Sequence, residues 1–213
     1  MPRQKKTQPT SEEQTIPTRE RILSAALTLF SQQGYIGATT RQIAAEAGVA
    51  ELTLFRHFPR KELIMQELLQ TRSSLSVVRE VLPKVQHLSC KAALNTVARV
   101  FLATLRERKE LLKIFLSECS RYPEQVKEMH FSFMVNLFET LAGYLQELQK
   151  KEIVRSMDLR CAAQAFFGIF YSYFISRDII GFSDTTGTTE DDYIRDYVEI
   201  FIHGIQGTAY GKL

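Results

Sequence analysis

The chain has few of the residues that break helices or form tight loops. Its 213 residues include only 10 glycines and 6 prolines. No stretch shows the alternation of polar and apolar residues that is typical of a half-buried strand. Hydrophobic residues make up 45% of the sequence, which is enough for a buried core. We therefore predict an all-α protein of one or two domains.

Long uncharged runs and a leader segment are also missing. The longest uncharged stretch, residues 161–176, has sixteen residues, whereas a helix needs about 20 apolar residues to cross a bilayer. The N-terminus is polar and charged and has no apolar segment of the kind found in signal peptides. We therefore expect a cytoplasmic protein without a membrane partner, and we interpret residues 161–176 as part of a buried helix.

Cysteine, histidine and catalytic motifs are sparse. Three cysteines without related spacing, Cys90, Cys119 and Cys161, indicate reduced thiols. A buried structural role is commoner for such residues than a role in redox sensing. No two histidines have the helical spacing of metal ligands. There is no nucleophile elbow and no glycine-rich phosphate loop. We expect neither enzyme activity nor a metal or other cofactor.

Charge is distributed unevenly along the chain. Residues 1–61 contain nine Lys and Arg against five Glu, whereas residues 62–213 contain eighteen basic against nineteen acidic residues. A basic N-terminal segment would attract the phosphates of a nucleic acid. Because the excess is small, chance distribution is an alternative explanation.

The segment TTRQIAAEAGVAELTLFRHFPRK, residues 39–61, carries the most specific pattern. Its apolar residues recur at helical spacing, with Ala44 and Gly48 four residues apart and Leu54 six residues further on. Alanine lets two helices cross closely, glycine adopts the left-handed turn conformation, and leucine anchors the second helix. This pattern predicts a helix-turn-helix, which places its second helix in the major groove of DNA.

Residues 18–63 also resemble the DNA-binding region of TetR-family transcriptional regulators. The matching positions comprise a first helix ending in Phe30 and Gly34, followed by Thr39-Thr40-Arg41, Ile43-Ala44, Ala47-Gly48-Val49, Thr53-Leu54-Phe55, His57-Phe58 and Lys61-Glu62-Leu63. The resemblance implies an N-terminal three-helix DNA-binding domain and a C-terminal helical domain for ligand binding and dimerisation.

Three regions are expected along the chain. Residues 1–17 form a disordered polar and basic arm that either contacts DNA or is a solvated tail. Residues 18–62 form the helix-turn-helix domain, and residues 63–213 form the effector-binding and dimerisation domain. Further helices after the helix-turn-helix are predicted at about residues 60–81, 90–106, 109–119, 123–150, 158–180 and 190–208.

Two predicted helix starts carry cations, at Arg41 and at Arg60-Lys61. A cation at this end opposes the helix dipole, but the arrangement becomes favourable when a phosphate docks there. Thr39 and Thr40 belong to the first of these helix starts. The pattern favours phosphate binding over the alternative of solvated charges.

The resemblance implies a role for each position in DNA recognition. Thr39, His57 and Lys61 correspond to phosphate contacts, and Arg41 corresponds to a guanine reader. The base-facing positions are occupied by Glu51, Leu52 and Thr53. Three residues depart from the family: Ala50 lacks a capping side chain, Leu52 is bulky, and Phe55 replaces a tyrosine that would donate to phosphate. The operator half-site is therefore not predictable from relatives.

The helix expected at 158–180 is apolar almost all round, so both of its sides need covering. A partner subunit is the simplest cover for one side, and a larger intramolecular core is the alternative. With the last helix, it would form a four-helix homodimer interface, as the resemblance implies, over a near-palindromic DNA site. The interface residues expected are Phe166, Ile169, Phe174, Ile194, Tyr197, Val198, Phe201 and Ile205.

The resemblance further implies a pocket for an unknown small-molecule effector. Candidate pocket residues are Glu118, Arg121, Tyr122, His130, Phe131, Phe138, Tyr144, Phe170 and Tyr173, with core packing as the alternative for each aromatic residue. Together these patterns predict a dimeric, sequence-specific DNA-binding regulator, a repressor released by its effector. The alternative is a DNA-binding regulator without an effector that a protein partner controls.

Overall fold

The computed structural model describes residues 16–70, 74–118, 122–183 and 187–207. Within these ranges the secondary structure is helical, apart from an isolated antiparallel bridge between Val154 and Gln206. The all-α prediction is therefore confirmed. The arm expected at 1–17 lies outside the described residues except for its last two positions. No described helix is both long and apolar enough to cross a bilayer.

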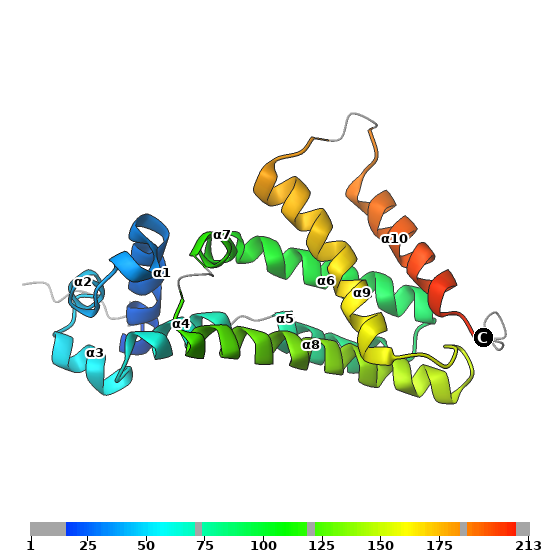
Figure 1. Ribbon diagram of the computed structural model, residues 1–213, viewed down its shortest axis with the longest axis horizontal. Coiled ribbons are helices and arrows are strands. Elements are labelled where there is room, and N and C mark those ends of the chain that lie inside the picture. Colours follow the sequence, from blue (N-terminus) through cyan, green and yellow to red (C-terminus); the bar gives the residue numbers. More distant parts are fainter. Residues whose placement is uncertain (1–15, 71–73, 119–121, 184–186, 208–213) are drawn as a thin grey trace, which may run out of the picture.

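Three helices form a head at one end of the molecule (Figure 1). They are α1 (Thr18–Gly37), α2 (Thr40–Glu46) and α3 (Glu51–His57). The predicted end of the first helix at Gly34 is a kink, where glycine adopts φ 72°, and one further turn follows.

The region of the single helix expected at 60–81 is helical on both sides of residues 71–73. The structure has two helices there, α4 (Lys61–Gln70) and α5 (Ser74–Val85), on either side of three residues that it does not describe. Pro83 lies inside the last turn of α5 instead of following the helix. Proline has a helical φ, but it cannot donate to the carbonyl four residues earlier, so this turn of α5 has one backbone donor fewer than a regular helix.

Five further helices follow and form most of the body. They are α6 (Cys90–Glu107), α7 (Lys109–Glu118), α8 (Glu124–Lys150), α9 (Leu159–Phe174) and α10 (Glu190–Ile205). The π-helix η2 (Ile175–Ile180) continues α9, so the helical stretch expected at 158–180 is confirmed. In Figure 1, α8 runs along most of the body beside α5, and α9 crosses α8 and α6. At about 1.5 Å per residue, the 27 residues of α8 span about 40 Å.

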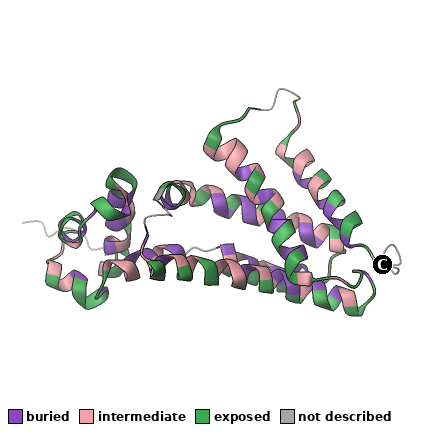
Figure 2. Ribbon diagram, in the orientation of Figure 1, coloured by how far each residue is buried: buried purple, intermediate pink, exposed green. Residues whose placement is uncertain are grey.

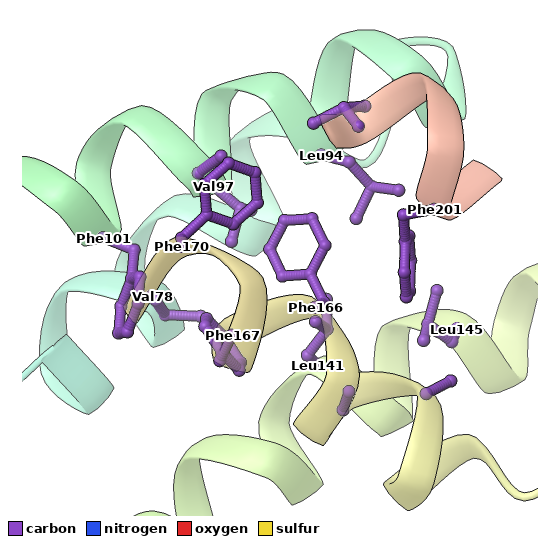
Figure 3. Close-up of a cluster of buried hydrophobic side chains, with 14 of the residues drawn as sticks. Val78, Leu94, Val97, Phe101, Leu141, Leu145, Phe166, Phe167, Phe170 and Phe201 are labelled. Carbon is purple, nitrogen blue, oxygen red and sulfur yellow. The ribbon is translucent and has the colours of Figure 1, made fainter. Parts of the chain in front are cut away.

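The body core is built around phenylalanines of α9. The ring of Phe166 packs against Phe170 and Phe201, each with a centroid distance of 5.1 Å. Figure 3 shows Phe166 and Phe201 pointing toward each other among side chains of α5, α6 and α8. A single chain therefore covers both sides of most of α9.

This core changes the interpretation of the predicted dimer interface. Six of its eight expected residues are at most 6% exposed in a single chain. They belong to the intramolecular core and cannot also meet a partner: Phe166, Phe174, Ile194, Val198, Phe201 and Ile205. The prediction is corrected for these six, whereas Ile169 and Tyr197 remain partly exposed.

A second core joins the head to the body. Buried residues of α1 to α4 pack in one cluster with Leu111, Ile114 and Phe115 of α7 and with Val126 of α8. The ring of Tyr122, just before α8, meets Tyr35 of α1 edge-on at a centroid distance of 5.2 Å. Head and body are thus joined by continuous apolar packing as well as by the chain itself.

Candidate DNA-binding face and effector cavity

Thr39 fixes the start of α2 with a capping box. Its hydroxyl oxygen accepts from the Gln42 backbone N–H at 3.2 Å, and its own N–H donates to Gln42 Oε1 at 2.9 Å. Such reciprocal bonds satisfy two donors that the first helical turn leaves open. The start of α2 is therefore rigid.

The turn between α2 and α3 has the geometry that the sequence predicts. Gly48 adopts φ 65°, and the N–H of Val49 donates to the carbonyl of Ala44 at 2.9 Å. Ala44 and Leu54 are buried between the helices. A positive φ is readily accessible only to glycine, so the helix-turn-helix is confirmed at this position.

Two arginines of α1 hold this unit in place, and the sequence analysis missed both. Arg21 donates to the carbonyls of Ala47 and Gly48 at 2.5 and 2.9 Å. Arg19 lies over the ring of Phe58 at 4.4 Å and forms an ion pair with Glu67. Both side chains reach residues far away in sequence, and no local pattern signals such contacts.

The outer side of α2 and α3 is largely exposed (Figure 2), although the expected base readers Glu51 and Thr53 are half-buried. Arg41 is exposed on α2, and Leu52 and Phe55 of α3 are 75% and 40% exposed. Thr40 donates its hydroxyl to Glu51 Oε1 at 2.9 Å, so these two predicted DNA contacts also bind each other across the helix pair. The result is a largely exposed face in which one hydrogen bond orients Glu51.

Cations surround this face. Within the described part of the chain, no ion pair involves Arg41, Arg56 or Arg60, and all three side chains are exposed. His57 and Thr39 are exposed as well. This surface can meet a polyanion without breaking internal ion pairs, and neutralised phosphates release counterions.

Lys61, a predicted phosphate contact, has partners within the head. Its ammonium group donates to the carbonyls of Tyr35 and Ala38 at 2.7 and 2.9 Å and lies 4.4 Å from the centre of the Tyr35 ring. The first residue of α4 is thereby attached to the connection between α1 and α2. Its ammonium group therefore stabilises the head through these internal contacts.

A cavity of about 270 Å³ lies in the body, between α6, α8 and α9. The junction of α4 and α5 closes one side of it, at Leu69 and Ser74. Its walls are mostly apolar, and the remaining lining residues are Phe101, Leu105, Arg108, Leu112, His130, Phe133, Met134, Leu137, Phe138, Gln164, Phe167, Gly168 and Tyr171. A concave, apolar site with a few polar groups is typical of small-molecule binding.

The structure brings only some of the predicted pocket residues to this cavity. His130 and Phe138 line it. Phe131 is 70% exposed, and Phe170 is a core residue.

Three other predicted pocket residues lie at different places. Tyr122 belongs to the junction of head and body, where it packs against Tyr35. Tyr144 and Tyr173 line shallow grooves elsewhere on the body. Arg121 and the side chain of Glu118 lie outside the described residues.

Arg108 is the cavity residue that the sequence analysis missed. It lies between α6 and α7, and its guanidinium donates to the carbonyls of Leu68 and Leu69 at 2.8 and 3.0 Å. Burial lowers its pKa to about 10, so it stays charged at neutral pH. No described carboxylate pairs with it. The cavity therefore contains a cation without an anionic partner.

His130 lies beside this charge, and its ring packs on Phe115 at a centroid distance of 4.1 Å. Burial, and to a lesser extent the charge of Arg108, lower the pKa of His130. The imidazole is thus neutral at neutral pH and offers one donor and one acceptor.

The lowered pKa of His130 predicts a pH dependence of stability. The unfolded chain binds a proton below about pH 6.5 that the native chain does not bind. The free energy of unfolding should therefore fall as the pH drops below about 6.5, by up to about 1.4 kcal/mol per pH unit for one proton. Urea unfolding between pH 5 and pH 7.5 measures this slope, and His130→Phe should reduce it. Equal slopes in the two proteins would contradict the prediction.

The sequence matches two family models. One, described as bacterial regulatory proteins of the tetR family, matches residues 22–68. The other, described as the C-terminal domain of AefR-like transcriptional repressors, matches residues 92–204. The first match covers most of the head and α4, and the second covers more than half of the chain.

Individual proteins match along nearly the whole chain. The HTH-type transcriptional regulator YvkB of Bacillus subtilis is 27% identical over 189 residues, which are 89% of this chain and 97% of YvkB. The structure of the flavonoid-responsive regulator FrrA is 25% identical, with a TM-score of 0.71, over 90% of this chain and 98% of FrrA. FadR of Bacillus subtilis, solved in complex with stearoyl-CoA, is 21% identical with a TM-score of 0.69, over 88% and 99% of the two chains.

Proposed function

Since the chain belongs to the TetR family of bacterial transcriptional regulators, we propose that it is a dimeric repressor that a small-molecule effector releases from its operator. As a member of this family it is a DNA-binding regulator. The proposal rests on one observation above all: the helix-turn-helix holds an exposed reading face, with Arg41 and Leu52 directed to solvent.

Each side chain of this face has a chemical role in the proposal. Arg41 donates two bonds to the major-groove edge of a guanine, and Leu52 and the methyl group of Thr53 pack on thymine methyl groups. Glu51, oriented by Thr40, accepts from a cytosine amino group.

Phosphates are bound at the edges of the reading face. Thr39 and His57 contact phosphates that set the register of the head on the duplex. Phe55 contributes its ring and no hydrogen bond, because it has no hydroxyl group.

The proposed dimer uses the exposed sides of α9 and α10. On α9 these sides carry the small residues Ala165 and Gly168 beside Ile169, which allows a second helix to approach closely. On α10 they carry Ile200, which is 65% exposed, and Tyr197. A two-fold dimer would present two copies of α3 to a near-palindromic site.

The effector site in this proposal is the 270 Å³ cavity. Two neighbours support a small-molecule effector: FadR was solved with stearoyl-CoA, and FrrA is named for its response to flavonoids. The cavity of this chain has a volume of only about 270 Å³, so its effector is small.

Substitution of Arg41 tests the reading face. Arg41→Ala is expected to weaken binding to the preferred site by about 1–3 kcal/mol, or about 5- to 150-fold, and to relax specificity at one base pair. The preferred site is first selected from a random DNA library, and affinity is then measured by fluorescence anisotropy at two salt concentrations. Arg56→Ala is the matched control, because its cation is expected to contact phosphate and to weaken all sequences alike.

Two outcomes would contradict parts of the proposal. Selection of unrelated sequences with a steep salt dependence would indicate non-specific binding. A broad ligand screen without any thermal shift or loss of operator binding would instead favour regulation by a protein partner.

A further inference from the structure

The helix that connects head and body is attached by a cation at each end. Lys61, the first residue of α4, donates to carbonyls of the α1–α2 connection. Arg108 donates to the carbonyls of Leu68 and Leu69 in the last turn of α4. Cations bound to the last carbonyls of a helix stabilise that end. The position of α4 therefore depends on both side chains.

Arg108 is also part of the cavity wall, so the same side chain is available to a ligand. Its two recorded bonds both come from Nη2, and a guanidinium has five N–H donors. Among the described side chains none supplies a carboxylate to it. A partly buried cation without a counter-ion favours an anion in the adjacent space.

The rest of the cavity limits the chemistry of that anion. None of the lining residues is acidic, and the polar ones besides Arg108 are uncharged: Ser74, His130, Gln164 and Tyr171. One cation balances one negative charge, so a doubly charged phosphate group would be left partly uncompensated. The planar guanidinium matches the two oxygens of a carboxylate.

The size and the walls limit the rest of the ligand. The 270 Å³ equal the liquid volume of about nine water molecules, which corresponds to on the order of ten non-hydrogen atoms. Phe101, Phe138 and Phe167 form apolar walls around this space. An aromatic ring or a medium-length alkyl chain would fill it.

We propose that the effector is a small aromatic or alkyl monocarboxylate, and that its carboxylate binds Arg108 in competition with the last carbonyls of α4. This inference rests on the proposed function and names its ligand class and its coupling. Binding would free the end of α4 that faces the cavity, while Lys61 keeps the other end attached to the head. A shift of α4 is therefore passed to the reading face.

A second set of contacts runs between cavity and head in the same direction. From His130, rings follow one another through Phe115 and Tyr122 to Tyr35, with centroid distances of 4.1, 5.3 and 5.2 Å. Tyr35 also supplies a carbonyl to Lys61. A ligand that displaces His130 would therefore also shift Tyr35, whose carbonyl accepts a hydrogen bond from Lys61 at the start of α4.

The test compares charged and neutral probes on the full-length chain. Cinnamate and octanoate are titrated by calorimetry beside their neutral amides, which have the same shape. Each carboxylate is expected to bind about 10- to 100-fold more tightly than its amide, because a hydrogen bond to a charged group is stronger than a neutral one. The carboxylates, but not the amides at equal concentration, should weaken binding to the selected operator.

Two variants and a control assign the effect to Arg108. Arg108→Met should bind the carboxylates and their amides equally and should lose operator binding partly without any ligand, since α4 is no longer held. Arg108→Lys keeps the charge without the planar fork, and an intermediate affinity is expected. Arg79→Met removes an exposed cation on α5 and should behave as wild type. Circular dichroism establishes that each variant is folded.

The outcomes separate this inference from the proposed function. Equal binding of acids and amides, or wild-type carboxylate affinity in Arg108→Met and Arg108→Lys, would overturn the role of Arg108 while leaving an effector-released repressor intact. If no compound in a broad library of neutral and charged molecules altered operator binding, the role of Arg108 and the proposed effector-released repressor would both be contradicted. Carboxylate binding that leaves operator affinity unchanged would overturn the coupling through α4.

Discussion

Replacing Phe166 with alanine is expected to lower the free energy of unfolding by about 3–5 kcal/mol, the range for a fully buried phenylalanine. Its ring is 0% exposed and is in edge-on contact with Phe167, Phe170 and Phe201. Truncation removes these contacts and leaves a cavity that a dense core closes only in part. Urea unfolding followed by circular dichroism measures the change.

The same experiment separates a core residue from a subunit contact. Phe131→Ala removes an equal ring from a position that is 70% exposed and should change stability by less than about 0.5 kcal/mol. The loss in Phe166→Ala should be the same at two protein concentrations, because dissociation of a dimer depends on concentration and core packing does not. If Phe166→Ala unfolded at the same urea concentration as wild type but sedimented as a monomer, Phe166 would be a subunit contact and not a core residue.

Lys61→Met is expected to destabilise the chain by about 2–4 kcal/mol. The substitution keeps the aliphatic stem but removes two charge-assisted hydrogen bonds, each of the class that contributes about 1.5–3 kcal/mol. It also removes the cation above the Tyr35 ring, which is worth about 0.5–2 kcal/mol. Because these terms overlap, the total should stay below their sum.

Arg60→Met is the matched control for Lys61. Arg60 precedes α4 and is exposed, so its loss should leave the free energy of unfolding within about 0.5 kcal/mol of wild type. For DNA binding we expect the larger effect from Arg60→Met. This variant should reduce the salt dependence of operator affinity by the equivalent of about one phosphate contact. Wild-type stability in Lys61→Met together with a reduced salt dependence would support the phosphate role that the sequence predicts for Lys61.

The helix-turn-helix was predictable because its determinants are local. The cap at Thr39, the left-handed Gly48 and the buried Leu54 lie within sixteen residues of one another. Each of them acts on its own turn or on the adjacent helix. The structure places Gly48 and Leu54 as the sequence predicts and assigns the cap to Thr39.

Contacts between distant segments were not predictable in this way. Arg21 meets the carbonyl of Ala47, 26 residues away, and Arg108 meets that of Leu69, 39 residues away. An arginine on a helix surface has the same local pattern whether it is solvated or bound to a carbonyl. Lys61 illustrates the consequence, since a cation at a helix start suggested a phosphate and the fold supplies carbonyls.

The sides of α9 show a second limit of sequence patterns. A helix that is apolar all round must be covered on both sides, but periodicity does not distinguish an internal cover from a subunit. The structure assigns the large residues Phe166 and Phe170 to the internal core. It leaves the small residues Ala165 and Gly168 exposed. A prediction that weights hydrophobic size therefore selects the side of α9 that the chain itself covers.

The length of α8 has a consequence for how precisely the body can position the head. A rod of about 40 Å converts a rotation of about 10° at one end into a displacement of about 7 Å at the other. Successive base pairs lie 3.4 Å apart along DNA, so this displacement equals about two base-pair steps. In the proposed dimer, a rotation of this size would thus suffice to put the two heads out of register with neighbouring major grooves.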